Sequence, residues 1–254
     1  MKGLISFQAL IEREYHRFLR LAGQTLLPPV IMSILFIVIF GYSLGPRIRE
    51  ISGFPYIIFI LPGLAGMAVL NNAYSNVITS LYMARTDRSI ENILVSPNSY
   101  LKIVSAFVIG GVTRGFLVGA IVLAVAIPLT GLTIASLPLT LLLLLTNATV
   151  FASFGVITAL WAETWDHLAT ITNFVIIPFA YLGGVFYSID MLPGAWRTVS
   201  LCNPLFYMID GIRWAVLGYG DVSPILSIGI SVGLALGCFA VAVYLFRIGY
   251  KLIV

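Results

Sequence analysis

Two short segments of the sequence place charged side chains at spacings that could do chemistry. Residues 84–97 read ARTDRSIENILVSP, a polar break between two apolar runs. Residues 207–218 read YMIDGIRWAVLG and place Asp210 and Arg213 three positions apart, on one face of a helix. Pairing of opposite charges lowers the cost of holding them in a poorly solvated region. The first segment therefore predicts a surface for a partner, and the second predicts a structural ion pair.

The surface predicted at residues 84–97 combines charges with apolar contacts. A short helix that ends at Pro97 could transmit a movement from a soluble partner protein that supplies the energy. Ile93 and Leu94 would then be the apolar anchors of the contact, and the charges would set its register. The alternative is a solvated loop with a balanced set of charges. The charged side chains are Arg85, Asp87, Arg88 and Glu91, and the apolar ones are Ile90, Ile93, Leu94 and Val95.

The sequence carries no pattern that predicts a catalytic centre or a metal site. No GxxxxGK[ST] phosphate loop, HExxH or GxSxG motif occurs. The two cysteines, Cys202 and Cys238, lie 36 residues apart and have no metal-binding spacing. We therefore expect no cofactor on this chain, and any uphill transport must draw its energy from a partner.

The composition predicts an integral membrane protein. Of the 254 residues, 60% are apolar or aromatic and only 9% are Asp, Glu, Lys or Arg, whereas soluble domains carry about a quarter charged residues. A soluble chain of this length cannot bury so much apolar surface. A soluble enzyme, a nucleic-acid-binding protein and a disordered scaffold are therefore excluded.

Long apolar runs predict an all-α membrane protein with six spans in one domain, residues 1–254. Each run reaches the roughly 20 residues needed to cross the hydrocarbon. Residues 188–223 contain only short apolar runs and predict two helices that dip into the membrane and return. The expected spans are 24–44, 56–83, 100–128, 137–161, 168–187 and 224–246, so that the first five lie within residues 24–187.

Residues 3–22 predict an amphipathic helix. Its basic face suits anionic headgroups, which favours a helix lying in the membrane interface; packing on protein is the alternative. Glu14, near the edge of the apolar face, is the one poor fit. The apolar face holds Leu4, Phe7, Ile11, Tyr15, Phe18 and Ala22, and the opposite face Lys2, Arg13, His16, Arg17 and Arg20.

The distribution of Lys and Arg predicts that both termini lie in the cytoplasm. With the N-terminus inside, nine of these residues fall on the inner side and four on the outer side, Arg47, Arg49, Arg197 and Arg213. Arg114 falls within the third span, beside Gly110, Gly111, Gly115 and Gly119, which predict close helix packing. A lone arginine without an intramembrane carboxylate argues against an ion-coupled carrier. We expect Arg114 to bind a helix carbonyl or polar group rather than a substrate.

Three stretches give the chain its resemblance to a known family. They are FILPGLAGMAVLNNAYSNV at 59–77, RSIENILVSPNS at 88–99, and YLGGVFYSIDMLPGAWRTVSLCNPLFYMIDGIRWAVLG at 181–218. The third, with its GGVFY, LP, NP and D-x-x-R elements in order, is the most specific. The chain resembles type-2 ABC exporter permeases over essentially its whole length, and most closely the YadH/NodJ-like group, which includes daunorubicin-type drug exporters.

The resemblance implies a half-transporter in the inner membrane. Two six-span permeases would pair as a homodimer with two separate ATPase subunits, which would hold the ATP and Mg. It implies that residues 85–97, including Ser96, form a coupling helix docked in the ATPase. It also implies that residues 188–217 form re-entrant helices on the outer side, and that the second and fifth spans line the path.

Candidate path residues follow from those two spans. Asn and Thr side chains can equally join helices within a bundle, and the aromatic ones can belong to an interfacial belt. The candidates are Asn72, Asn76 and Thr79 in the second span and Asn173, Phe179, Tyr181 and Tyr187 in the fifth.

Together with the resemblance, the sequence favours an export permease, and the resemblance implies that a partner ATPase drives it. The alternative is a non-transporting membrane assembly or sensor subunit. Few intramembrane charges favour a hydrophobic or lipid-linked substrate over a small ion.

Overall fold

The computed structural model describes residues 2–20, 22–44, 48 and 50–252. Arg47 and Arg49, two of the expected outer arginines, lie outside the described residues, as do the side chains of Lys2, Leu4 and Ala22.

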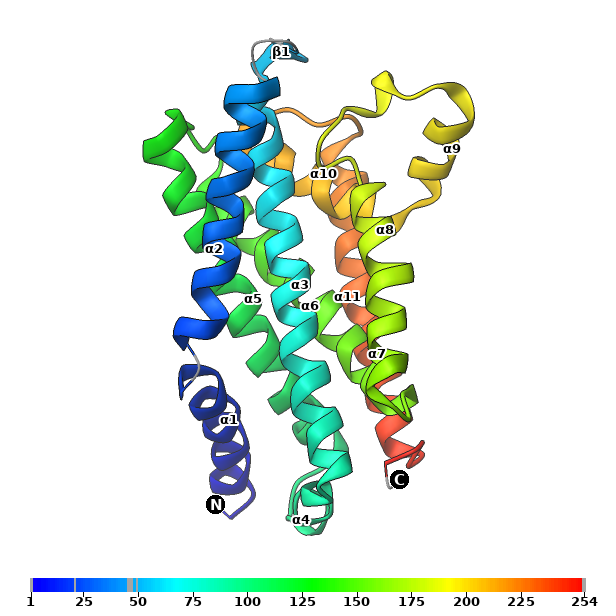
Figure 1. Cartoon of the computed structure of the whole chain (residues 1–254). Helices are drawn as coiled ribbons and strands as arrows, with labels where there is room; N and C mark the ends of the chain where they lie inside the picture. The colour runs from blue at the N-terminus through cyan, green and yellow to red at the C-terminus, as the bar shows by residue number, and fades with distance from the viewer. Residues whose placement is uncertain (1, 21, 45–47, 49, 253–254) are drawn as a thin grey trace.

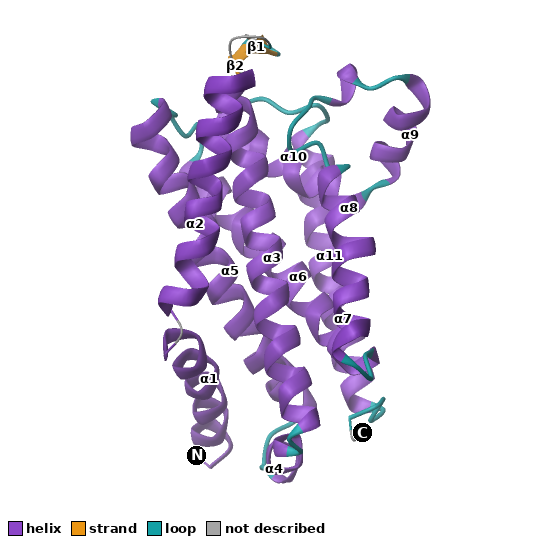
Figure 2. Cartoon of the chain, viewed as in Figure 1, coloured by secondary structure: helices purple, strands orange, loops and turns teal. Residues whose placement is uncertain are grey.

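The described chain is a bundle of helices with one two-stranded hairpin (Figures 1 and 2). Both chain ends and the short helix α4 lie at one end of the bundle, and the hairpin and α9 lie at the other (Figure 1). The elements are α1 (Lys2–Arg20), α2 (Ala22–Val38), η1 (Ile39–Leu44), β1 (Glu50–Ile51), β2 (Phe54–Pro55), α3 (Tyr56–Thr86), α4 (Ser89–Val95), α5 (Tyr100–Thr130), α6 (Leu137–Trp161), α7 (Trp165–Ile171), η2 (Thr172–Ile176), α8 (Ile177–Tyr181), η3 (Ile189–Met191), α9 (Gly194–Cys202), α10 (Pro204–Leu217) and α11 (Pro224–Arg247).

Among the described residues, five helices are long and apolar enough to cross a membrane. They are Gly23–Gly41, which covers most of α2, together with α3, α5, α6 and α11. The chain is thus a helical membrane protein with several apolar helices, and these five agree in place with five of the six expected spans.

The remaining expected span, residues 168–187, differs in form. Here α7, η2 and α8 follow one another as seven, five and five residues, so the helical run begins at Trp165 and ends at Tyr181. The middle segment is a π-helical turn, a feature that widens a helix locally and is frequent at functional sites. Beyond Tyr181 the chain turns at Gly184, which adopts a positive φ of 74°, so the helix does not continue to residue 187.

Local sequence signals set the helix starts. Side-chain oxygens of Ser99 and Asn203 accept hydrogen bonds from backbone N–H groups in the first turns of α5 and α10, at 3.4 and 3.0 Å. Such caps satisfy donors that have no partner inside the helix. Proline occupies the first turn of α6, α10 and α11, where its missing N–H costs little.

Helix α3 forms the centre of the bundle. Its side chains are buried along nearly the whole length by α5, α6 and α10. By contrast, few apolar side chains of α2 and α11 are fully buried, and many are exposed, as expected for surfaces that meet lipid or another protein chain.

Helix α5 approaches α3 closely at its glycines, as the sequence predicts. A Cβ atom added at Gly115 would lie 2.7 Å from Ala73 Cβ and 2.9 Å from the backbone oxygen of Val69. Backbone atoms cannot give way, so only a residue without a side chain permits this approach.

Gly115→Ala should destabilise the fold by about 1–3 kcal/mol, because the new methyl group overpacks the α3–α5 contact. Gly237→Ala is the matched control, since a Cβ added at Gly237 on α11 meets nothing within 4 Å. That variant should be neutral or gain up to about 1 kcal/mol. Equilibrium unfolding in mixed micelles measures both, and equal effects would contradict the packing argument.

Candidate functional site

A pocket of about 350 Å³ opens between α2, α3 and α8. Its walls are apolar apart from a few neutral polar groups, and ligand pockets commonly have this character. Asn71 and Asn72 contribute amides, and Ser33 and Tyr181 contribute hydroxyls. The other lining residues are Pro28, Pro29, Met32, Phe36, Leu64, Met67, Ala68 and Ile177.

Aromatic rings cluster at one edge of this pocket. The rings of Phe36 and Tyr181 lie 6.0 and 5.9 Å from the ring of Phe186, measured between centroids. Phe40 stacks on Phe186 at 5.1 Å. The sequence did not single out Phe36 or Phe186, because nothing in a sequence links two residues 150 positions apart.

The amides of the second-span candidates bind the neighbouring helices. Arg114 Nη2 donates to Asn72 Oδ1 at 3.1 Å, and Asn72 also borders the pocket. Arg17 Nη2 donates to Asn76 Oδ1 and to its backbone oxygen at 3.0 and 2.9 Å, and Nη1 donates to Thr79 at 3.4 Å. Asn76 and Thr79 thus join helices, one of the two alternatives left open by the sequence.

Helix α1 packs on α5, and its polar side chains reach α3. Glu14 is buried, and its carboxylate accepts from Ser80 Oγ at 2.7 Å and from Arg17 at 3.1 Å. These partners explain why an acidic residue, Glu14, can lie at the edge of the apolar face of α1. The structure differs from the sequence prediction at Arg17, because partners on α3 draw this side chain inward from the face assigned to headgroups.

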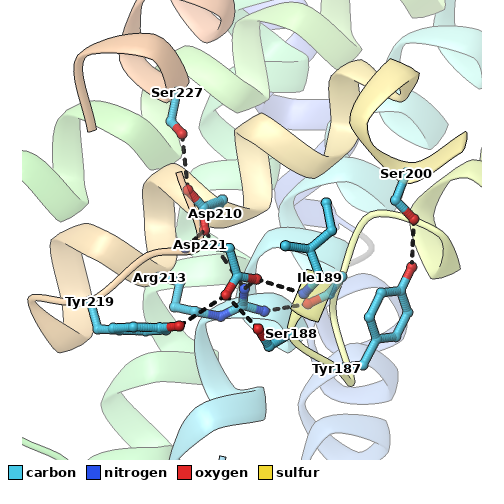
Figure 3. Close-up of polar contacts among 10 residues, drawn as sticks. Tyr187, Ser188, Ile189, Ser200, Asp210, Arg213, Tyr219, Asp221 and Ser227 are labelled. Carbon is cyan, nitrogen blue, oxygen red and sulfur yellow. Dashed lines mark hydrogen bonds and ion pairs between the residues drawn. The ribbon is translucent and has the colours of Figure 1, made fainter. Parts of the chain in front are cut away.

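The fifth-span candidates lie in different surroundings. Asn173 and Phe179 are exposed, on the π-helical turn and on α8, while Tyr181 borders the pocket. Tyr187 lies beyond the helix, with its hydroxyl 3.2 Å from that of Ser200 (Figure 3). Of these four residues the structure brings only Tyr181 close to Asn72.

The predicted partner surface forms a short helix, α4, at the end of the bundle that holds both chain ends (Figure 1). Asp87 Oδ1 accepts from the Ser89 backbone N–H at 2.9 Å, which fixes the helix start. The same backbone hydrogen bond is the main reason that the pKa of Asp87 is lowered from its ordinary value. Ser96 Oγ donates to the Ile93 carbonyl at 2.6 Å, and Pro97 follows.

At two residues of the segment 84–97, the structure differs from the expected partner surface. Ile93 is only 5% exposed and packs in the core with Ile90, and Arg85 is buried in α3. These two side chains are therefore not available to a partner. Leu94 is half-buried, whereas Val95 is 87% exposed and is the most exposed apolar side chain of α4. The exposed charged residues of the segment are Asp87, Arg88 and Glu91.

At the opposite end, a buried ionic network surrounds Arg213 (Figure 3). Its Nη1 lies 3.8 Å from Asp210 Oδ1 and 3.4 Å from Asp221 Oδ2. Its Nη2 donates to the Gly184 carbonyl, and its guanidinium carbon lies 4.2 Å from the centroid of the Phe59 ring. The expected partners Asp210 and Arg213 are thus close together, but sequence reasoning missed Asp221.

Asp221 joins three segments of the chain. Its carboxylate accepts from Ser188 Oγ at 2.6 Å, from the Ile189 backbone N–H at 3.0 Å and from the Tyr219 hydroxyl at 3.1 Å. Its own N–H donates to Asp210 Oδ1 at 2.7 Å. The network holds the segment after α8 against α10 and the turn before α11 (Figure 3). The sequence could have indicated this role, since Asp221 is an acidic residue in a segment that also contains other Asp and Arg residues.

The chain is similar in sequence to a known protein family and to named bacterial proteins. Residues 5–217 match the family described as ABC-2 type transporter. The chain is 39% identical over 241 residues to the inner membrane transport permease YadH of Escherichia coli (strain K12), covering 95% of this chain and 92% of that protein. It is 27% identical over 234 residues to nodulation protein J of Rhizobium meliloti (strain 1021), covering 92% and 87%.

Proposed function

Because the chain belongs to the ABC-2 type transporter family, we propose that it is the permease subunit of an ABC exporter, driven by ATP hydrolysis on a separate subunit. The ATP and Mg bind to that partner. Similarity to a relative named as an inner membrane transport permease supports the transport role and the inner-membrane location.

Helix α4 is the observation that carries the proposal. It is a short helix whose start is fixed by the hydrogen bond from Ser89 to Asp87, and it presents exposed charges together with an exposed apolar residue, Val95. Buried apolar anchors with orienting rim charges are the usual design of a protein interface. Docking of a cytosolic ATPase here also places both chain ends in the cytoplasm, because they share this end of the bundle (Figure 1).

The proposed transporter contains two copies of this chain. Exposed apolar side chains on α2 and on the η2–α8 run, such as Phe174 at 77% exposure, supply a surface for a second copy. The pocket between α2, α3 and α8 then faces the centre of the dimer. The α7–η2–α8 run forms the fifth of the six spans, α11 forms the sixth, and α9 and α10 form the re-entrant outer segment.

The pocket supports a hydrophobic or lipid-linked substrate. Its volume of about 350 Å³ lies within the range of small-molecule sites. Neutral amides and hydroxyls offer hydrogen bonds without a charge requirement. Arg114 does not line the pocket but donates a hydrogen bond to Asn72, which does. It therefore acts as a structural group rather than as a direct ligand.

Purified alone, the chain should hydrolyse no ATP, because it carries no phosphate loop. Captured from its native membrane together with an ATPase that has such a loop, it should hydrolyse ATP, and a substitution of the loop lysine in the ATPase should abolish turnover. Reconstituted vesicles then test export of fluorescent lipids and hydrophobic dyes. Hydrolysis by the chain alone, or a chain that purifies with no such ATPase, would contradict the proposal.

A further inference from the structure

We propose that Arg85 is a positioning residue that joins the end of α3 to the α6–α7 junction, so that a displacement of α4 moves the α7–η2–α8 run beside the pocket. The proposal rests on the function proposed above for the part that concerns transport. The connection itself concerns this chain alone.

Arg85 binds the carboxyl end of α6. Its side chain is only 2% exposed, and Nη1 donates to the carbonyl oxygens of Ala159 and, at 2.9 Å, Ala162. These carbonyls lie in the last turn and at the cap of α6, where backbone acceptors lack partners within the helix. The negative end of the helix dipole also favours a cation at this place. Arg85 thus fixes α3 to α6 through charge-assisted hydrogen bonds.

Tyr82 makes a second connection one turn earlier on α3. Its hydroxyl donates to the Glu163 backbone oxygen at 3.1 Å. Its ring lies edge-on to Trp165, the first residue of α7, with 4.6 Å between centroids. Arg85 and Tyr82 together hold the end of α6, the connecting turn and the start of α7.

The link between α3 and α4 is short and held by hydrogen bonds. Only Asp87 and Arg88 separate the two helices. The N–H of Asp87 donates to the Met83 carbonyl at 2.9 Å, and that of Arg88 to the Arg85 carbonyl at 3.2 Å. Since Ile90 and Ile93 are also buried in the core, α4 cannot swing independently of the end of α3.

At the far end, the α7–η2–α8 run contributes Ile177 and Tyr181 to the pocket wall. The π-helical turn, Thr172–Ile176, lies between the clamped start of α7 and these residues. A chain of direct contacts therefore runs from the exposed surface of α4, through Arg85 and Tyr82, to one wall of the pocket. Packed elements of this kind shift between discrete arrangements rather than deform continuously.

Spin labels test the connection in the isolated full-length chain. Cysteines replace Val95 on α4 and Phe174 on the π-helical turn, both highly exposed, with Cys202→Ser and Cys238→Ala in the background. We expect a narrow distribution of label distances with Arg85 present and a broadened one in Arg85→Gln. Tyr82→Phe, which removes one hydroxyl and keeps the ring contact, should give a smaller broadening. Arg197→Gln, at an exposed arginine on α9, is the control and should leave the distribution unchanged.

The complex with the ATPase gives the transport readout. Arg85→Gln should still purify with the ATPase and hydrolyse ATP, while substrate moved per ATP falls at least about fivefold, the low end of typical coupling between sites. Tyr82→Phe should fall less and is the informative variant if Arg85→Gln does not fold. An unchanged distance distribution in both variants would overturn the connection. Absence of an associated ATPase in the unmodified protein would overturn the proposed function and leave the distance test decisive for the connection.

Discussion

Replacing Arg213 with alanine should destabilise the protein by about 3–5 kcal/mol, the usual effect of breaking a buried ionic pair by removing one partner. The substitution leaves the carboxylates of Asp210 and Asp221 buried without their cation, and it leaves the Gly184 carbonyl without its donor. Equilibrium unfolding in mixed micelles measures the loss.

A matched control lies on the same side of the molecule. Arg197 forms an ion pair with Asp190 at 3.1 Å, but both side chains are exposed. Exposed pairs contribute about 0–1 kcal/mol, so Arg197→Ala should have little effect. Equal losses at the two arginines would show that burial of the Arg213 network does not determine its contribution.

Double-mutant cycles apportion the Arg213 network between its two acids. Contacting residues typically couple by about 0.5–3 kcal/mol. Both pairs should show coupling, and Asp221 should couple more strongly than Asp210, because its carboxylate lies closer to the guanidinium. Additive effects of Asp210→Asn and Arg213→Ala would contradict the pairing expected from the sequence.

Val95→Asp should weaken binding of the ATPase by about 30-fold or more, corresponding to a hot-spot contact of about 2 kcal/mol. The substitution places a carboxylate on the most exposed apolar residue of α4 without touching its buried face. Titration of the purified ATPase onto the reconstituted chain measures the affinity.

Two further variants separate docking from folding. Val199→Asp changes the same residue type on α9, at the opposite end of the bundle, and should leave ATPase binding unchanged. Ile93→Asp should instead destabilise the folded chain, because Ile93 is buried. A Val95→Asp protein with full affinity and full transport would show that α4 is only a connector.

Five of the six expected spans agree in place with long apolar helices, and the family expected from the sequence is confirmed. Residues 137–161 match α6 because polar breaks bound an apolar run on both sides. Residues 168–187 did not predict the end of the helix at Tyr181, because apolar composition continues past it. The turn at Gly184 depends on Arg213, a contact between residues far apart in the chain.

Side-chain partners were harder to predict than spans. The helical pattern of residues 3–22 placed Arg17 among the basic residues, but it held no information on Asn76, its partner on another helix. Ile93 shows the same difficulty, since α4 has apolar residues on more than one side and only the packing against the core selects which are buried.

The near-complete burial of α3 also has an evolutionary consequence. Residues of α2 and α11 that face outward can exchange one aliphatic side chain for another with little change in packing. Exchanges along α3 alter volume inside a close-packed interior and are felt throughout it. Low divergence of α3 among relatives would therefore reflect selection for packing, and it would be a poor guide to which residues meet the substrate.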